Sequence, residues 1–334
     1  MSSFDAVNAL PTELASLIKE TASENVGLSN LLSKLLGACR TIGTVMRDGG
    51  YSSAAVGSQN VFGDNQLDVD VKTDAVMFKA LKECGVVHVA ASEENPVEIE
   101  CGGAGYGYSV AFDPLDGSSI IDANFAVGTI CGIWPGRGLV GRTGREQTAA
   151  LVCQYGPKVT IALALNSGAT LSGESVSLEL TMLQSSWIVS IPKITIAPKA
   201  KTFAPGNLRA TFDNDNYKQL VAHWIDNKYT LRYSGGLVPD VYHILIKGQG
   251  VLSNASSASA KAKLRLLFEC APIALIIEAA GGASCVCATE IAEPCEPISL
   301  LDVVATDIDK RVGVCFGSSE EVQRFKSYIF SSLA

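Results

Sequence analysis

The segment Tyr-Ser-Val-Ala-Phe-Asp-Pro-Leu-Asp-Gly-Ser-Ser, residues 108–119, decides the fold class of this 334-residue chain. Residues 109–112 are an apolar run that predicts a strand, and the strand leads into Asp113. Pro114 cannot continue a hydrogen-bond ladder, so we expect a turn there that brings Asp116 beside the first carboxylate. Two neighbouring carboxylates repel each other, and a bound hard cation such as Mg²⁺ commonly neutralises this repulsion.

A Gly-Ser-Ser turn follows the second carboxylate directly. Gly117 has no side chain, so the backbone amides of Ser118 and Ser119 can point at an anion. A cation site and an anion site would then lie within a few residues of each other, as metal-assisted phosphate chemistry requires. An isolated Asp-x-x-Asp pattern is more typical of a capped surface turn, and the acidic residues elsewhere in the chain decide between the two readings.

Further carboxylates follow two predicted strands in the first half of the chain. Residues 66–71 alternate polar and apolar side chains, which predicts a strand with Asp68 on one face. Residues 86–90 predict the next strand, and it leads into Glu93 and Glu94. Because layered α/β proteins hold ligands at the carboxyl ends of their strands, we expect these acids to share one site.

The second half of the chain predicts one more acidic strand end. Residues 263–269 are interpreted as a strand that carries Lys263 and Arg265 on one face and ends at Glu269. A stretch rich in Pro and Lys between residues 192 and 205 marks a change of composition. We therefore predict two domains, residues 1–198 with the metal site and residues 199–334 completing the substrate site.

Composition excludes several kinds of partner. Hydrophobic residues make up 47% of the chain and charged residues 18%, which is typical of a globular protein with a large core. The net charge of −8 argues against nucleic acid, and no apolar run is long enough to predict a membrane span. Ten scattered cysteines predict buried thiols in a reducing compartment, and the acidic N-terminus is unlike a transit peptide. We expect a cytoplasmic protein.

The acidic residues at the predicted strand ends are too many for one pocket without metal. They are Asp64, Asp68, Glu93, Glu94, Asp113, Asp116 and Glu269. With Mg²⁺ they could bridge metal ions and activate water, since paired metals about 3.5–4 Å apart clamp both oxygens of a phosphoryl transfer.

The motif Asp-Pro-Leu-Asp-Gly-Ser-Ser, together with Ser-Glu-Glu at residues 92–94, resembles the lithium-sensitive, Mg²⁺-dependent sugar phosphatases. It is most similar to the fructose-1,6-bisphosphatase family. Residues 203–214, 228–236 and 262–269 are similar to the sedoheptulose-1,7-bisphosphatase branch of that family. The resemblance implies an α/β (α+β) fold arranged as a five-layer αβαβα sandwich.

The resemblance also implies a role for each candidate site residue. Metal ligands would be Glu93, Asp113, Asp116, Glu269 and the carbonyl of Leu115. Water would be activated by Asp68 and Glu94, with Asp64 close by. The 1-phosphate would be held by the amides of Gly117, Ser118 and Ser119, next to Asp116. The far phosphate would be bound by Asn207, Arg209, Arg232 from across a subunit boundary, Tyr233, Lys263 and Arg265.

The implied reaction is hydrolysis of the 1-phosphate of sedoheptulose 1,7-bisphosphate. The resemblance implies two to three Mg²⁺ ions per subunit, replaceable by Mn²⁺, and a homodimer or homotetramer. Fructose-1,6-bisphosphatase, a dual-specificity bisphosphatase and an inositol-phosphate phosphatase are the alternative enzymes. An inactive sugar-phosphate sensor is disfavoured, because no acidic position of the motif carries Asn or Ala.

One loop departs from the family pattern. Chloroplast members carry a Cys-Gly-Gly-Thr-Ala-Cys regulatory loop, whereas residues 53–58 here read Ser-Ala-Ala-Val-Gly-Ser. Serines stand where the two cysteines would be. We therefore expect neither light-linked redox control nor a plastid location.

Overall fold

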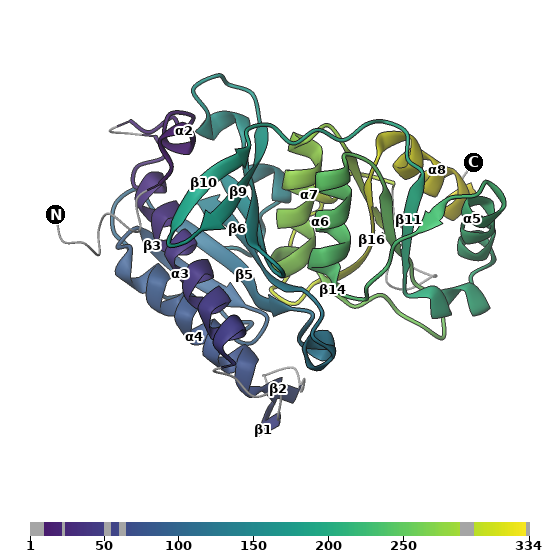
Figure 1. The fold of residues 1–334 in the computed structure, drawn as a ribbon, viewed down its shortest axis with the longest axis horizontal. Coiled ribbons are helices and arrows are strands. Elements are labelled where there is room, and N and C mark those ends of the chain that lie inside the picture. The colour runs from purple at the N-terminus through teal and green to yellow at the C-terminus, as the bar shows by residue number, and fades with distance from the viewer. Residues whose placement is uncertain (1–9, 22–23, 50–54, 60–64, 288–296, 332–334) are drawn as a thin grey trace.

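The computed structural model describes residues 10–21, 24–49, 55–59, 65–287 and 297–331, and it stacks their helices and sheets in five alternating layers (Figure 1). The first helical layer holds α3 (Leu28–Asp48) and α4 (Asp68–Glu83). The middle layer holds α6 (Leu237–Lys247) and α7 (Ala271–Ala279), and the last holds α5 (Asp215–Asp226) and α8 (Ser319–Ile329). A sheet lies between each pair of helical layers, so the predicted αβαβα sandwich is confirmed.

The first sheet has eight strands in the order β10-β9-β8-β7-β6-β5-β3-β4. In chain order these are β3 (Val87–Ser92), β4 (Ile99–Glu100), β5 (Tyr108–Asp116), β6 (Val127–Pro135), β7 (Ala149–Tyr155), β8 (Val159–Leu165), β9 (Val176–Leu183) and β10 (Ser186–Ile191). Only the β3–β5 pair is parallel. The parallel pair brings the carboxyl ends of β3 and β5 together, which places their acidic residues at one edge.

Both faces of the first sheet are buried. Along β5, Val110 and Phe112 pack into the core with α3 and α4, whereas Ala111 between them packs into the core with α6 and α7. Strand side chains alternate between faces, so a strand covered on both sides must be apolar throughout. This explains the continuous apolar run at residues 109–112 that the sequence shows ahead of the acidic motif.

The second sheet has the order β12-β11-β13-β16-β14, with β15 also paired to β16. Its strands are β11 (Thr202–Gly206), β12 (Thr230–Leu231), β13 (Val251–Asn254), β14 (Leu264–Arg265), β15 (Ala283–Cys287) and β16 (Arg311–Gly317). Outside both sheets lie α2 (Thr12–Ala15) and the small hairpin of β1 (Ala55–Gln59) and β2 (Asn65–Leu67). None of the described helices combines the length and the apolar character that a membrane crossing needs.

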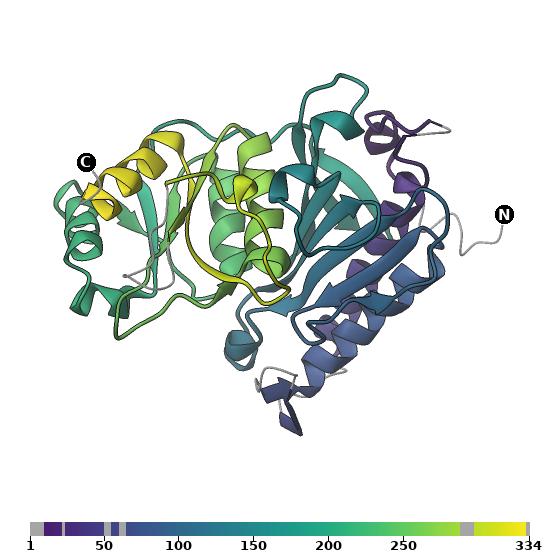
Figure 2. The same ribbon diagram turned by 180° about the vertical axis from the view of Figure 1, so that it is seen from behind.

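The two halves of the chain are tied together behind the middle helices. Figure 2 shows the yellow segment before β16 running back over α7 toward the first sheet. There the Arg145 guanidinium binds Asp302 at 2.8 Å, and the Gly141 amide donates to the Ala305 carbonyl at 2.7 Å. The chain passes between the sheets at residues 192–201, where β10 ends and β11 begins. The domain boundary at residue 198 stays a prediction.

The strand expected at residues 66–71 is wrong beyond its first residues. β2 ends at Leu67, and α4 begins at Asp68. The Leu67 amide donates to the Asp70 carboxylate at 3.4 Å, and acidic residues in a first helical turn are favoured by the helix dipole. The alternating Asp and Val residues therefore begin a helix. The Asp70 carboxylate accepts a hydrogen bond from the Leu67 amide, which in a strand would pair with a neighbouring strand.

The strand expected at residues 263–269 is also too long. β14 covers only Leu264–Arg265, and a π-helical turn, η5 (Leu266–Cys270), leads directly into α7. All five residues of this turn are buried, so an apolar run here fills the space between the sheets without forming a strand. Glu269 consequently lies on a helical turn and not at a strand end.

Candidate metal and phosphate site

A β-bulge in β5 brings the two aspartates of the motif together. Asp113 lies opposite Ile130 of β6, and Asp116 lies opposite Gly128, so β5 has one residue more than β6 between these pairs. The strand therefore continues through Pro114, and the predicted turn at this proline is wrong. Proline is tolerated at bulges because no ladder N–H is required there, and bulges commonly re-aim side chains beside functional sites.

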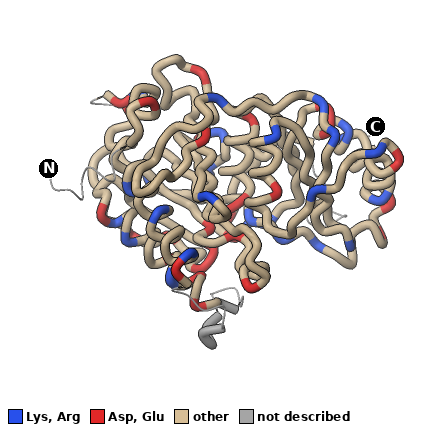
Figure 3. Tube along the Cα trace, viewed as in Figure 1, with Lys and Arg blue, Asp and Glu red and all other residues tan. Residues whose placement is uncertain are grey.

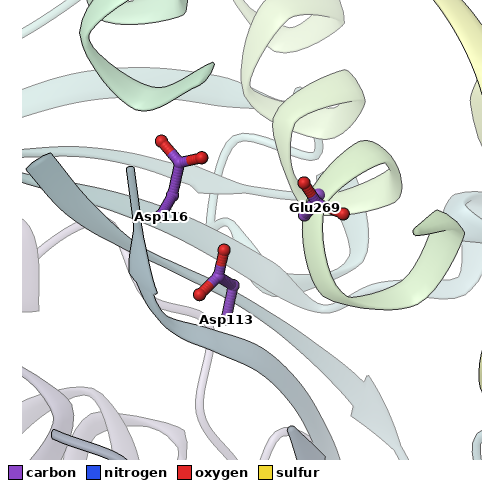
Figure 4. Close-up of side chains that lie close together, drawn as sticks. All are labelled: Asp113, Asp116 and Glu269. Carbon is purple, nitrogen blue, oxygen red and sulfur yellow. The ribbon is translucent and has the colours of Figure 1, made fainter. Parts of the chain in front are cut away.

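Glu269 completes a cluster of three carboxylates. Carboxylate oxygens of Asp113, Asp116 and Glu269 all lie within 4.8 Å of one another. Figure 4 shows the two aspartates on β5 and the glutamate on the helical turn facing it, with the carboxylates directed into one space. Residues separated by more than 150 positions in the sequence thus converge, as the sequence predicted.

A backbone N–H also holds each of the three carboxylates. The donors to Asp113, Asp116 and Glu269 are the amides of Leu115, Val238 and Arg265, at 2.9, 2.6 and 2.5 Å respectively. Val238 lies in the first turn of α6, so the positive end of that helix dipole faces Asp116. The carboxylates are therefore fixed in direction by the main chain while they face one another.

Electrostatics show that the cluster fits a hard cation. Burial, followed by the charge of Glu93, raises the pKa of Asp113 and that of Glu269 well above their usual values. Burial also raises the pKa of Asp116 to about 7. In each case the ionised carboxylate is disfavoured, because burial removes the water around it and other negative charges lie close by. A divalent cation bound by carboxylate oxygens would remove both penalties.

Glu93 reaches the cluster from the end of β3. Its amide donates to the Phe112 carbonyl at 3.1 Å, which extends the parallel pairing with β5. The buried guanidinium of Arg265 binds the Glu93 carboxylate and donates from Nε to Asp309 at 2.7 Å. The structure thus places Arg265 beside a predicted metal ligand, whereas the resemblance assigned it to the far phosphate. No sequence pattern pointed to Asp309, which lies 44 residues after Arg265 in the chain.

The first turn of α4 adds a carboxylate that the sequence analysis did not select. Asp70 is buried, and its Oδ1 has no hydrogen-bond partner among the described residues. Its pKa is raised to about 6, chiefly by burial and also by the charge of Glu93, while hydrogen bonds with the Leu67 amide and with Ser118 oppose the rise. By contrast, the carboxylate of Asp68 binds Lys72 at 2.7 Å, one helical turn away.

Two further predicted acids are Glu94 and Asp64. Glu94 follows Glu93 in the bend after β3 and is partly buried. Asp64 lies outside the described residues. Figure 3 shows acidic positions in red gathered where α4 and β5 meet, in the lower middle of the view, while basic positions are spread over the chain.

The Gly-Ser-Ser segment forms a turn, as the sequence predicts. Gly117 has φ of 86°, a left-handed conformation that favours glycine. Directly after it, η1 (Ser118–Ala123) is a short 3-10 turn, closed by the Ile120 amide donating to the Gly117 carbonyl at 3.0 Å. The amides of Ser118 and Ser119 therefore open the turn next to Asp116, which suits an anion near a metal.

The predicted far-phosphate residues lie at the start of the second half. Tyr233 and Arg209 are exposed, and they lie close enough for the Arg209 charge to lower the tyrosine pKa against the stronger effect of burial. Lys263 is exposed ahead of β14. Arg232 is exposed as well, and it donates to the neighbouring Leu231 carbonyl at 2.9 Å.

Asn207 has a structural task in addition to its predicted one. Its side-chain amide nitrogen donates to the carbonyls of Ala255 and Ala260, at 2.8 and 2.9 Å. Its own backbone is left-handed, with φ of 48°. Both amide hydrogens thus hold the loop after β13, and only the side-chain oxygen is left for other contacts.

Two family models match the chain, and together they define its class. One, described as fructose-1-6-bisphosphatase, N-terminal domain, matches residues 13–173, and the other, fructose-1-6-bisphosphatase, C-terminal domain, matches residues 196–330. The chain belongs to the fructose-1,6-bisphosphatase family, as the sequence motifs predicted.

Individual relatives place the chain within this family. It is 42% identical to the chloroplastic sedoheptulose-1,7-bisphosphatase of Chlamydomonas reinhardtii, over 93% of this chain and 76% of that protein. It is 36% identical to the class 1 fructose-1,6-bisphosphatase of Citrifermentans bemidjiense, over 90% of this chain and 87% of that protein. A Toxoplasma gondii crystal structure, described provisionally as a sedoheptulose-1,7 bisphosphatase, matches with a TM-score of 0.84 and 38% identity, covering 98% of this chain and 99% of that chain.

Proposed function

We propose that this chain hydrolyses the 1-phosphate of sedoheptulose 1,7-bisphosphate and releases sedoheptulose 7-phosphate and inorganic phosphate. The observation that carries this proposal is the convergence of Asp113, Asp116 and Glu269 within 4.8 Å beside the anion turn at Gly117. The relatives support the choice of sugar, since the chloroplastic sedoheptulose-1,7-bisphosphatases are 42–43% identical and the class 1 fructose-1,6-bisphosphatases are 34–36% identical.

The acidic cluster supports Mg²⁺ as the cofactor of this family member. The proposed ligands are the carboxylates of Glu93, Asp113, Asp116 and Glu269 and the carbonyl of Leu115. When bound, Mg²⁺ supplies Lewis-acid stabilisation of phosphoryl oxygens and a more acidic water. Two to three ions per subunit, with Mn²⁺ as a substitute, remain our proposal, because one acidic triad supports at least one ion and Glu93 and Asp70 extend it.

Proton transfer is proposed for the carboxylates beside the metal ligands. Asp70 has a pKa of about 6 and a buried oxygen with no partner among the described residues, so it can accept a proton near neutral pH. Glu94 keeps its proposed part in orienting the attacking water. Asp68 is the weaker candidate, since its carboxylate is paired with Lys72.

The far end of the substrate is proposed to lie against Arg209, Tyr233 and Lys263. Lys and Arg bind phosphate through charge-assisted hydrogen bonds, which are lost if the phosphate falls short. Both sugars present a similar C1 phosphate, so the far phosphate must discriminate between them. A fructose-1,6-bisphosphatase or a dual-specificity enzyme is the second candidate, favoured by the class 1 relatives at up to 36% identity.

The test is phosphate release from a substrate panel in the presence of Mg²⁺. The panel contains sedoheptulose 1,7-bisphosphate, fructose 1,6-bisphosphate and inositol 1-phosphate, with phosphorus NMR to show which phosphate is lost. We expect Mg²⁺-dependent loss of the C1 phosphate from the heptulose. Loss of the C7 phosphate, or turnover of the inositol compound alone, would contradict the proposal.

Assembly and location are proposed on separate grounds. A homodimer or homotetramer is supported by the exposed Arg232, which the resemblance places across a subunit boundary. A cytoplasmic location is supported by the burial of all nine cysteines within the described residues, since buried thiols are typical of proteins in a reducing compartment. Size-exclusion chromatography with light scattering, and cell fractionation, test the two proposals.

A further inference from the structure

Residues 232–236 connect β12 to α6 and carry Tyr233, a proposed far-phosphate residue. One carboxylate fixes this connection from inside the helix. The Ser234 amide donates to Asp240 Oδ1 at 2.7 Å, and the Gly235 amide donates to Asp240 Oδ2 at 3.2 Å. Asp240 is buried, with 6% of its surface exposed, and it lies one turn inside α6. Both oxygens of a single buried anion therefore hold two successive amides of the connection.

The same helical turn also contacts the metal end of the site. The Val238 amide donates to Asp116 at 2.6 Å. Gly236 lies so close to the anion turn that a Cβ added to it would be 3.1 Å from Ile120 Cδ1. The start of α6 is thus attached to a metal ligand on one side and packed against the 1-phosphate turn on the other.

The connection needs such an anchor because its own backbone is permissive. Gly235 has φ of 98°, and no atom lies within 4 Å of a Cβ added there, so neither packing nor a side chain restrains it. At its other end the Arg232 amide donates to the Phe203 carbonyl at 3.0 Å. Between that bond and the helix, the connection is tied to α6 by the two bonds to the Asp240 carboxylate and by the Asp240 amide, which donates to the Gly236 carbonyl at 3.3 Å.

We propose that Asp240 is the positioning residue that holds residues 232–236 at a fixed distance from the metal site, and so sets the length of bisphosphate that the site accepts. The proposal rests on the proposed function and deepens it. The Asp240 carboxylate accepts its hydrogen bonds from the connection, and its charge adds to the effect of burial in raising the pKa of Tyr233 and that of Asp116. We therefore infer that it acts on the far phosphate through Tyr233 and its neighbours. A buried carboxylate that accepts two N–H bonds is a strong anchor, because leaving it or the amides unpaired is costly.

The primary test is the substitution Asp240→Asn. Its matched control is Asp226→Asn, the same substitution at an exposed position of α5. An asparagine retains one acceptor oxygen and replaces the other with a donor, so one of the two amides loses its bond. The measured quantity is the ratio of kcat/KM for sedoheptulose 1,7-bisphosphate to that for sedoheptulose 1-phosphate. We expect the ratio to fall about tenfold in Asp240→Asn, mainly through KM, as loss of one such bond implies.

A second variant tests the connection without changing the carboxylate. Gly235→Ala adds a side chain to open space but strains a backbone with φ of 98°. It should lower the same ratio and leave turnover of the monophosphate within about twofold, because the metal end is untouched. An equal loss for both substrates in both variants would assign Asp240 to general stability and overturn the proposal.

A structural readout separates failure of this inference from failure of the proposed function. Hydrogen exchange at the Ser234 and Gly235 amides should be at least tenfold faster in Asp240→Asn than in Asp226→Asn, whatever the substrate is. If exchange accelerates and the wild-type enzyme shows no preference for the bisphosphate, the proposed substrate is wrong while the anchor stands. If exchange is unchanged, the positioning role is excluded.

Discussion

At the scale of single residues, the site depends on carboxylates whose ionised form is disfavoured by burial and by neighbouring negative charge. Asp116 shows this best, because it serves the proposed cation and accepts an N–H from the start of α6 at 2.6 Å. An amide side chain in its place could still accept that hydrogen bond through its oxygen. The same substitution would remove the negative charge that a cation needs.

Asp116→Asn should therefore lose nearly all Mg²⁺-dependent phosphate release, by about a thousandfold or more, and should still fold. Thermal unfolding measured on the same sample shows whether the fold is kept. Asp122→Asn is the control, since Asp122 is an exposed acid on η1 just after the site. Near-normal turnover of Asp116→Asn would remove this residue from the ligand set.

Asp70 and Asp68 offer a direct comparison within one helical turn. We expect Asp70→Asn to lower kcat by about a hundredfold, in the range of general acid–base contributions, because its buried carboxylate faces Glu93 and Ser118. Asp68→Asn should change kcat by less than about fivefold, because it removes a partly exposed pair with Lys72. The reverse order of effects would return the catalytic role to Asp68.

The sequence predicted the carboxylates of β5 and η5 but not Asp70, and the reason is physical. Alternating Asp and Val at residues 68–71 satisfies a strand pattern, and it equally satisfies the first turn of a helix. The spacing of Asp70 and Asp74, four residues apart, was the available signal, since such pairs share one helix face. Both are buried in the structure, each with a pKa raised to about 6 by burial.

At the scale of elements, β6 and α6 must touch for Val238 to reach Asp116. Gly128 of β6 makes this possible, because a Cβ there would collide with the Val238 side chain and with the Cys153 carbonyl. The carbonyl belongs to a buried strand that cannot move aside without breaking its ladder.

Gly128→Ala should therefore destabilise the protein by about 2–3 kcal/mol and weaken activity by displacing α6. Urea unfolding and phosphate release measure the two effects. Gly168→Ala is the matched control, since a Cβ at Gly168 meets no atom within 4 Å. Equal stability of the two variants would show that α6 does not depend on close contact with β6.

Element boundaries were the part of the fold that the sequence could not define. Pro114 indicated a turn, but β5 pairs with β6 both before and after this proline, so the irregularity there is a β-bulge. Residues 263–269 indicated a strand, but residues 266–270 are all buried in a helical turn enclosed by two sheets. In both cases tertiary packing decided the outcome, which local pattern does not contain.

At the scale of the whole molecule, a net charge of −8 is combined with acids buried at the junction of the layers. The five-layer order itself was predicted only through the family resemblance, because composition and periodicity do not fix how sheets stack. The acidic site was predictable from the residues alone, since several acids follow apolar runs.

Metal removal should reverse the usual dependence of stability on pH. In the folded protein without metal, Asp70 and Asp74 have pKa values of about 6, against 3.8 for an ordinary aspartate. The folded state then binds more protons than the unfolded state between pH 4 and 6, so the free energy of unfolding falls as pH rises through this window. Each group contributes about 2–3 kcal/mol of this loss.

Chelated protein should accordingly unfold several degrees lower at pH 8 than at pH 5. Mg²⁺ should remove the part of the difference that comes from Asp70, because the charge of Glu93, a proposed metal ligand, acts on this carboxyl. Differential scanning calorimetry at both pH values, with and without Mg²⁺, measures this. A metal-free protein that is more stable at pH 8 would show that these carboxyls do not titrate as described.

The central claim is that the chain prefers a seven-carbon bisphosphate. The heptulose extends one carbon further than the hexulose, so we expect its far phosphate to reach the proposed cations at Arg209 and Lys263 and the shorter sugar to leave them unpaired. Such a mismatch costs about 1–3 kcal/mol, which corresponds to roughly tenfold to a hundredfold in specificity. The deciding measurement is kcat/KM for sedoheptulose 1,7-bisphosphate and fructose 1,6-bisphosphate at one Mg²⁺ concentration and one pH. We predict a ratio of about ten to a hundred in favour of the heptulose; equal values, or a preference for the hexulose, would contradict the account.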